Sequence, residues 1–272
     1  MLLATSRRRL SQEGVLRIGT WNVEYAYTRR LPAIQAALEQ YPADVWILTE
    51  THDDLVPIGC PHVAHSLARP KNWNGIRAGS RWVSIWSAFP IVSKILLDDA
   101  DQERTVVALL DTGTERPVIV YGTVLPWKGD RGVFTWEEHH RVIQQQRQEW
   151  KTLSDRYPDA DLVVAGDFNT DMGTGRHYGT KRGIFDLNQA FSECGLYCAT
   201  SPQRIPEGTL PYPPIDHIAV PKFWQDRTRL AAAWPADRKV HSDHSGVLIQ
   251  ADMPSSALKR EPKIGANIES RP

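Results

Sequence analysis

The sequence has few cysteines, no long apolar run and no excess of charge of either sign. Its three cysteines, Cys60, Cys194 and Cys198, are odd in number and lie outside any CxxC spacing. Scattered cysteines of this kind favour neither a disulfide framework nor a zinc site built on thiolates. We therefore expect a reducing compartment and predict a cytoplasmic protein.

Signals for export or membrane insertion are also missing from the pattern. Three arginines at 7–9 are followed by the polar residues 10–13 (LSQE), where a secretory signal requires an apolar run. No stretch reaches the roughly 18 to 20 apolar residues that span a bilayer. Lys plus Arg and Asp plus Glu number 32 each, so the net charge does not attract a polyanion from a distance. Any contact with nucleic acid must be local.

The length and ordinary composition favour one domain over residues 15–252, with flexible segments at 1–14 and 253–272. Within it, short runs rich in Val and Ile and bounded by turn residues predict buried strands. These runs are Val15 to Trp21, Val45 to Thr49, Trp82 to Ser87, Thr105 to Leu110, Pro117 to Thr123 and Leu162 to Ala165.

Two helices are predicted, one beginning at Leu31 and one running from Thr135 to about Leu153. Glu138 lies at the capping-box spacing from Thr135. The two strand runs between 105 and 123 follow each other without room for a helix, and parallel neighbours need a long crossover. The pattern therefore predicts an α/β fold in which mixed sheets are flanked by helices.

Polar side chains stand at the ends of the apolar runs, which is where α/β proteins place ligands. One such carboxylate can simply end a strand or cap a helix, but five clusters together are harder to explain in that way. The clusters are Asn22, Glu50, Asp167 with Asn169, Asp216 with His217, and Asp243 with His244.

The residue types suit hydrolysis of a phosphate ester, which needs an activated water and stabilisation of negative charge. Mg²⁺ prefers oxygen ligands, so Glu50 with Asn22 beside it is a candidate metal site. Asp167 can orient and deprotonate a water, while His244 held by Asp216 can stay protonated against the phosphate.

Five runs resemble, in order and spacing, the endonuclease/exonuclease/phosphatase superfamily of DNase I-like phosphoesterases. The runs are GTWNV (19–23), LTET (48–51), GDFN (166–169), IDH (215–217) and SDH (242–244). The resemblance covers residues 16–250. It implies a four-layer α/β sandwich with two facing mixed β-sheets flanked by helices, and cleavage of phosphoesters with Mg²⁺ or Mn²⁺.

The resemblance also implies roles for individual residues. Asn22 and Glu50 would hold the metal, and Asp243 would contribute to the same cluster.

Four further residues would carry catalysis. Asp167 would position or deprotonate the water, and Asn169 would bind the nucleophile or a phosphoryl oxygen. His244, oriented by Asp216, would stabilise the transition state.

One position departs from the family pattern. Many members place a His or Tyr that helps with the phosphate or leaving group where this chain has Val124. Thr123, Trp127 or Lys128 could supply a donor instead, or water could protonate the leaving group. His217 follows a site Asp and alternates to the other strand face, so we expect it to be structural.

The other histidines, namely His52, His139, His140 and His241, have no evident partner, and we expect most of them at the surface.

Two loops are candidates for substrate contacts. Residues 69–81 carry basic side chains, including Arg81, with Trp73 and then Trp82, and could meet phosphates and stack on a base. The alternative is a solvated loop with one core Trp. Residues 173–183 contain further basic side chains close to Asn169. They are Arg176, His177, Lys181 and Arg182.

The leading functional hypothesis is a divalent-metal-dependent phosphodiesterase or nuclease acting on nucleic acid. A phosphatase or phosphodiesterase acting on a small-molecule or lipid-derived phosphoester is the first alternative. An inactive binding module of the same fold is the second. No membrane association and no obligate protein partner is predicted.

Overall fold

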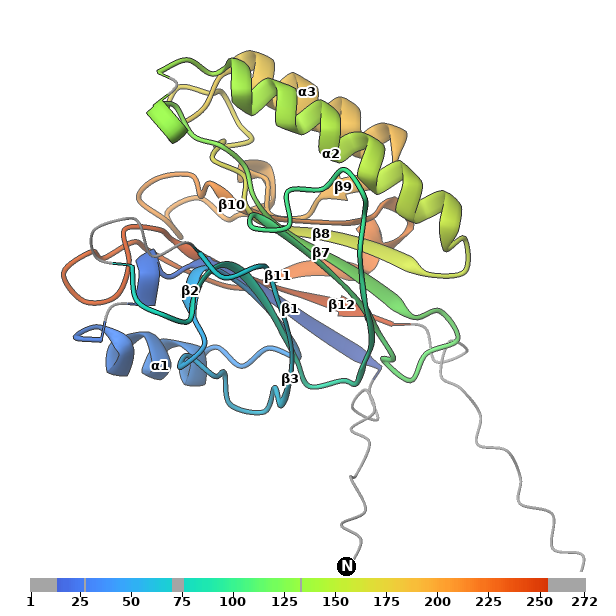
Figure 1. Ribbon diagram of the computed structural model, residues 1–272, viewed down its shortest axis with the longest axis horizontal. Helices are drawn as coiled ribbons and strands as arrows, with labels where there is room; N and C mark the ends of the chain where they lie inside the picture. Colours follow the sequence, from blue (N-terminus) through green and yellow to red (C-terminus); the bar gives the residue numbers. More distant parts are fainter. Residues whose placement is uncertain (1–13, 27, 70–75, 133, 254–272) are drawn as a thin grey trace, which may run out of the picture.

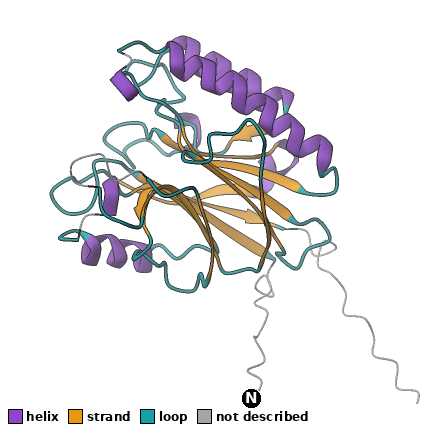
Figure 2. Ribbon diagram, viewed as in Figure 1, coloured by secondary structure: helices purple, strands orange, loops and turns teal. Residues whose placement is uncertain are grey.

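The computed structural model describes residues 14–26, 28–69, 76–132 and 134–253. Two six-stranded sheets pack face to face, and helices cover their outer faces (Figures 1 and 2). This arrangement confirms the predicted α/β sandwich with two facing mixed sheets. Apart from Gly14 and Met253, the segments expected to be flexible lie outside the described residues. Trp73, a predicted stacking residue, also lies outside them.

The first sheet joins strands from the two ends of the described chain. Its strands lie in the order β11 (Thr228–Trp234), β12 (Gly246–Asp252), β1 (Val15–Asn22), β2 (Val45–His52), β4 (Ser80–Ser87) and β3 (His62–His65). The pair β1 and β2 is parallel, and the other neighbours are antiparallel. Helix α1 (Leu31–Gln40) is the crossover that this parallel pair requires.

The second sheet has the same plan. Its strands lie in the order β5 (Ile91–Ile95), β6 (Thr105–Leu110), β7 (Val118–Val124), β8 (Asp161–Asp167), β10 (Asp216–Pro221) and β9 (Leu196–Cys198). Here β7 and β8 are the parallel pair, and α2 (Glu137–Arg156) is their crossover. The predicted succession of two strands between 105 and 123 is confirmed as the antiparallel pair β6 and β7.

The remaining helix and the short 3₁₀ segments connect these strands. Helix α3 (Lys181–Glu193) lies beside α2 on the outer face of the second sheet (Figure 1). The Thr180 side chain caps its first turn by accepting a hydrogen bond from the Gly183 N–H at 2.9 Å. The 3₁₀ segments are η1 (Glu24–Ala26), η2 (Asp130–Gly132), η3 (Pro202–Arg204) and η4 (Lys222–Arg227).

Three apolar cores hold the layers together. The largest lies between the sheets, the second joins α2 and α3 to the second sheet, and the third joins α1 to the first. Every residue of β7 and β8 is buried, because each strand has a covered sheet face on both sides. Such strands read as continuous apolar runs, which is why the sequence predicted them.

The structure corrects the prediction for the second helix. No side chain caps α2, which begins at Glu137 rather than Thr135, and Glu138 instead forms an ion pair with Arg141. The helix extends past Leu153 to Arg156. Helix α3 was not predicted, because its amphipathic start overlaps the glycine-rich segment that we read as a substrate loop.

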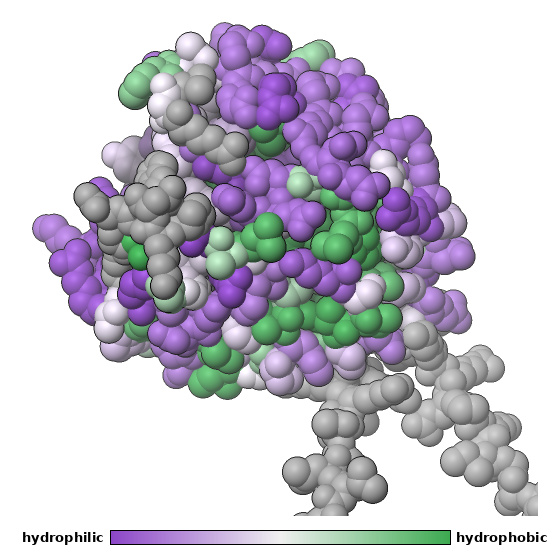
Figure 3. All heavy atoms as spheres, viewed as in Figure 1, coloured by the Kyte–Doolittle hydropathy of each residue, from purple (hydrophilic) through white to green (hydrophobic). Residues whose placement is uncertain are grey.

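The face of the molecule seen in Figure 3 is mostly hydrophilic, with apolar side chains gathered in bands across its middle. Within the described residues, no helix combines the length and the apolar character needed to cross a bilayer.

Gly166 tests how tightly β8 is packed at the end that carries Asp167. A Cβ at Gly166 would lie 2.0 Å from the Thr123 carbonyl oxygen, and the residue has φ +138°. We expect Gly166→Ala to lower the free energy of unfolding by about 3 kcal/mol or more in urea denaturation.

Gly195→Ala is the matched control. Gly195 also has a positive φ, +65°, but an added Cβ meets no atom of the described residues within 4 Å. Its expected cost is about 1 kcal/mol, from the backbone conformation alone. Equal losses in the two variants would contradict the close approach of β8 to β7.

Candidate active site

Strand pairing brings four of the five sequence clusters to one edge of the sandwich. Asn22 ends β1 and lies opposite Thr49 of β2, next to Glu50. Asp167 ends β8 and lies directly opposite Asp216, the first residue of β10. Because β10 is antiparallel to β8, its beginning meets the end of β8, and the two carboxylates face the same edge.

A turn before β12 adds the fifth cluster. The Ser242 hydroxyl donates to the Asn22 carbonyl oxygen at 2.6 Å and accepts the His244 N–H at 3.1 Å. The indole N–H of Trp21 donates to the His244 carbonyl oxygen at 3.0 Å. Ser242 and Trp21 thus hold the backbone that presents His244, which gives these two motif residues a structural purpose.

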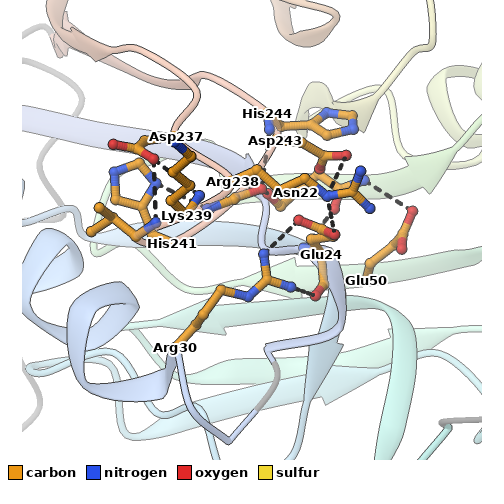
Figure 4. A network of polar contacts seen from close by, with 12 residues as sticks. Asn22, Glu24, Arg30, Glu50, Asp237, Arg238, Lys239, His241, Asp243 and His244 are labelled. Carbon is orange, nitrogen blue, oxygen red and sulfur yellow. Dashed lines mark hydrogen bonds and ion pairs between the residues drawn. The ribbon is translucent and has the colours of Figure 1, made fainter.

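The Asn22 side chain links the two halves of the site. Its Nδ2 donates to Glu50 Oε1 and to Asp167 Oδ2, both at 3.1 Å, while its Oδ1 accepts the Glu24 N–H at 2.9 Å. Figure 4 shows Asn22 between Glu24 and Glu50. One amide therefore bridges a carboxylate of the first sheet and a carboxylate of the second.

His244 and Asp216 form a short charged pair. Nδ1 of His244 lies 2.6 Å from Oδ2 of Asp216, which is fully buried. Burial by itself favours the neutral ring, but the negative charges of Asp216 and Asp167 raise the pKa of His244 to about 10. The ring is therefore an imidazolium at neutral pH, with Asp216 holding its orientation.

The pKa of Asp167 is also raised, but for a carboxyl group this shift favours the neutral form. Burial raises its pKa to about 7, although the positive charge of His244 and hydrogen bonds from Asn169 and Asn22 oppose this shift. Its Oδ1 accepts the Asn169 N–H at 2.9 Å. A carboxylate with a pKa near neutrality is well matched to taking a proton from water.

Two side chains of the site sit on unusual backbone. Glu50 and Asn169 have φ of +45° and +48°, in the left-handed region that non-glycine residues rarely adopt. Such strain persists only where the surrounding structure enforces it, and it is common at functional sites. The side-chain Nδ2 of Asn169 donates to the Leu125 carbonyl oxygen at 2.9 Å, which fixes its amide plane.

The donor set fits a hard divalent cation. Burial and the charge of Asp167 raise the pKa of Glu50, although its hydrogen bond from Asn22 works in the other direction. Among the described residues, neither Glu50 nor Asp167 forms an ion pair with Lys or Arg. A cation bound there would relieve this concentration of negative charge.

A second group of possible ligand atoms lies close by. One atom each of Asp167, Asp216 and His244 falls within 4.8 Å of the others. A protonated imidazole offers no lone pair, however, because both of its ring nitrogens carry hydrogen. We therefore assign the oxygen-only set around Glu50 as the better candidate for a metal site.

Sequence reasoning missed the residues around Asp243. The exposed Arg238 lies 4.0 Å from the Asp243 carboxylate and 3.0 Å from that of Glu24, which also binds Arg30 (Figure 4). Asp243 is thus brought to the same edge as Asn22, but at the rim. The only sequence signal was an acidic residue two positions after Asn22.

Two of the predicted substrate contacts are corrected. Arg81 is engaged in a two-pronged ion pair with Asp53, at 2.9 Å for each nitrogen. Thr123 is fully buried, and its hydroxyl accepts a hydrogen bond from Gln146 of α2. Neither side chain is available to a substrate in this arrangement.

The tryptophans of this region serve packing. Trp82 is buried, with the guanidinium groups of Arg69 and Arg104 at 3.6 and 4.4 Å from its ring centre, so the alternative of a core Trp is the correct one. Trp127 is half-buried, packs against the core between the sheets and lies 6.0 Å from the Trp82 ring.

The second candidate loop remains open to solvent. Arg176 and Lys181 are exposed. Arg182 forms ion pairs with Glu137 at 3.3 Å and Asp186 at 3.7 Å, but its side chain is also well exposed. These three basic residues follow Asn169 in the chain, and the side chains of all three are exposed to solvent.

The prediction that most other histidines lie at the surface is wrong. His52, His139 and His140 are buried. Burial lowers the pKa of His139 to about 4, and its ring bonds to Pro126 and Thr170. Its imidazole is therefore neutral and structural.

His217 lies where a structural residue is expected. It is fully buried, and its ring nitrogens bond to Thr200 and to the Thr170 carbonyl oxygen.

Comparison with known proteins agrees with this geometry. A sequence model of the Endonuclease/Exonuclease/phosphatase family matches residues 19–244. The chain belongs to this family. As a member, it is a hydrolase of the phosphoesterase and nuclease class. A comparison with curated protein sequences found no significant match.

Solved structures share the fold of this family member. It is similar to the AP endonuclease LMAP from Leishmania major, with a TM-score of 0.66 and 16% identity over 90% of each chain. It is also similar to the 3' phosphatase NExo from Neisseria bound to product DNA hairpin, with a TM-score of 0.59 and 20% identity. That match covers 88% of this chain and 99% of the other. An endonuclease/exonuclease/phosphatase from Beutenbergia cavernae has a TM-score of 0.61 and 18% identity, covering 88% and 72%.

The charge on His244 can be measured directly. In the metal-free protein we expect the His244 ring to stay protonated at pH 8 and to lose its proton at about pH 10. In Asp216→Asn its pKa should fall by roughly one to three pH units, because one of the three nearby anions is removed while burial still favours the neutral ring. NMR titration of the histidine ring signals reports both values.

His241 is the internal reference for this titration, because burial lowers its pKa below the ordinary value. A His244 ring that titrates together with His241 would contradict the charged pair.

Proposed function

We propose that the protein is a divalent-metal-dependent phosphodiesterase that cleaves nucleic acid by attack of a water activated by Asp167. The observation that carries this proposal is that one small site holds a carboxylate and an imidazolium in contact range, both with raised pKa values. Asp167 has a raised pKa near 7, while His244 beside it has a pKa of about 10. A base and a persistent cation are thereby available at the same pH.

The metal site proposed here consists of Glu50 and Asn22, with Asp243 at the rim. Mg²⁺ or Mn²⁺ bound there would neutralise charge on the phosphoryl oxygens and help to orient the phosphate. The Asn22 Oδ1 has a second lone pair besides the one that accepts the Glu24 N–H.

The residues of the second sheet would act on the reacting atoms. Asp167 accepts the proton of the water as it attacks phosphorus. The imidazolium of His244 donates a hydrogen bond to a phosphoryl oxygen, and Asp216 keeps the ring in place through the 2.6 Å contact. Asn169, with its amide plane fixed by Leu125, orients the water or a phosphoryl oxygen.

Nucleic acid is the proposed substrate class for two reasons. The exposed Arg176 and Lys181 follow Asn169 closely in the chain, so they can contact phosphates that flank the reacting one. The fold is shared with proteins described as an AP endonuclease and as a 3' phosphatase bound to a DNA hairpin. A net charge of zero favours a short contact with few phosphates.

Turnover should require a divalent cation, the Asp167 carboxylate and the His244 ring. Plasmid DNA, single-stranded DNA, RNA and bis-p-nitrophenyl phosphate are incubated with the protein in Mg²⁺, Mn²⁺ or EDTA. Asp167→Ala and His244→Ala should each lower kcat by roughly a hundredfold or more, because each removes a group needed in the transition state.

His62→Ala is the matched control, since His62 begins the edge strand β3 and pairs with Ser87 at the opposite end of the sheet. Near wild-type rates in either site variant would refute its role. No metal-dependent turnover on any substrate would favour the inactive binding module. Release of inorganic phosphate from a 3'-phosphorylated oligonucleotide, with diesters left intact, would identify a phosphatase instead.

The basic loop should contribute to binding more than to chemistry. Replacing Arg176 and Lys181 together by Ala should raise KM for the nucleic-acid substrate severalfold, with a smaller effect on kcat, because flanking phosphate contacts are equally present before and during reaction. Steady-state kinetics on an oligonucleotide measures the two constants.

Lys151→Ala with Arg156→Ala provides the control for net charge. Both residues lie near the carboxyl end of α2, which leads into the beginning of β8 and so lies far from Asp167. If the two double variants raised KM equally, the effect would come from overall charge and not from the loop.

A further inference from the structure

Tyr178 lies on a segment that is anchored beside Asn169. The buried Asp171 carboxylate accepts backbone N–H groups of Gly173 and Gly175, each at 2.9 Å, and of His177 at 3.0 Å. The Asp171 N–H donates in turn to the Tyr178 carbonyl oxygen at 3.1 Å. Burial favours the neutral acid, but these backbone donors lower the pKa of Asp171. The ionised Asp171 carboxylate therefore holds the backbone of this loop in place.

The next residue brings this segment against the catalytic strand end. Gly179 has φ +89°, and a Cβ added there would lie 3.1 Å from Thr170 Cα and 3.3 Å from the Asn169 carbonyl oxygen. Only glycine allows both this conformation and this approach. Gly179 therefore packs closely against Asn169 and Thr170, and this contact holds the backbone of the preceding residue, Tyr178, near Asn169.

The Tyr178 ring is also oriented. Its centre lies 5.8 Å from that of Trp136, with the ring planes at 88°, and the side chain is half-buried. Among the described residues, no hydrogen bond engages its hydroxyl. Burial, followed by the negative charges of Asp167 and Asp243, raises the pKa of Tyr178 to about 12. The hydroxyl thus keeps its proton, and it lies within electrostatic range of Asp167 at the end of β8 and of Asp243 in the turn before β12.

The position where the family pattern has a donor provides none here. Val124 is fully buried in the core between the sheets, and Thr123 is bonded to Gln146. The proposed phosphate-binding edge therefore lacks one donor. The segment beside Asn169 carries a tyrosine that interacts electrostatically with Asp167 and Asp243 and whose hydroxyl forms no hydrogen bond among the described residues.

From this placement, and resting on the proposed function, we infer that the Tyr178 hydroxyl is a catalytic residue that donates a hydrogen bond to a non-bridging oxygen of the reacting phosphoryl group. It does not protonate the leaving group, because the resulting phenolate would lie among the negative charges of Asp167 and Asp243. Its proton stays on the phenol throughout, and no covalent bond to Tyr178 forms or breaks.

The test is Tyr178→Phe, which keeps the ring that packs on Trp136 and removes only the hydroxyl. We expect kcat to fall roughly tenfold to a hundredfold, as for the loss of one hydrogen bond to a charged group, while KM changes little. Tyr212→Phe is the matched control, because Tyr212 is an exposed tyrosine on the neighbouring loop, with its ring stacked on His177. It should behave like the unsubstituted protein.

Two substrates distinguish the contact. A phosphoryl contact lowers kcat by the same factor for bis-p-nitrophenyl phosphate, with its good leaving group, and for a dinucleotide with a poor one. A loss confined to the dinucleotide would overturn the assigned contact, and a Tyr178→Phe kcat within about twofold of the parent value would overturn the catalytic role. If the parent protein turned over neither substrate with metal, the proposed function would fail first and this inference with it.

Discussion

The hydrogen bond between His244 and Asp216 joins the two sheets at one edge, and the catalytic geometry depends on it. His244 precedes a strand of the first sheet, whereas Asp216 begins a strand of the second. The Asn22 amide makes a parallel link, from the first sheet to Asp167 in the second. Elsewhere the sheets meet mainly through apolar packing, although Lys94 of β5 donates to the His65 carbonyl oxygen of β3. Polar contacts across the sandwich are therefore concentrated where chemistry is proposed, and they set the relative position of the sheets there.

Concentrating charge in this way opposes stability. Burial raises the pKa of Asp167 and of Glu50, which means that their ionised forms are costly in the metal-free protein. Left-handed backbone at Glu50 and Asn169 adds strain. The extensive cores on both faces of each sheet compensate for these terms. A bound cation would remove part of the same cost, so metal binding and folding of this edge are expected to be coupled.

The basic side chains around the site differ in whether other groups of the protein already engage them. On the side of β4, Arg81 is paired with Asp53, and Trp82 is enclosed by Arg69 and Arg104. On the side of α3, the loop that follows Asn169 leaves its basic side chains exposed, while Asp171 holds the backbone. Arg176 and Lys181, which form no ion pair among the described residues, are better suited to contact a polyanion than paired arginines, because no existing ion pair has to be broken.

The sequence by itself determined the fold class, the family and the order of the site clusters. Strands such as β7 and β8, buried on both faces, are visible as apolar runs, and a polar residue at the end of such a run must emerge at a sheet edge. It also indicated that His217 alternates away from the site. Only the tertiary structure decided which side chains are free to act. Arg81, Thr123 and Trp82 look like ligand-binding residues in the chain, but partners remote in sequence occupy them. Tyr178 looked like an ordinary loop residue until Asp171 and Gly179 placed it beside Asn169. The physical reason is that the pattern of apolar and polar residues along a strand is a local property. Side-chain pairing, burial and the resulting pKa shifts depend on neighbours that only folding brings together.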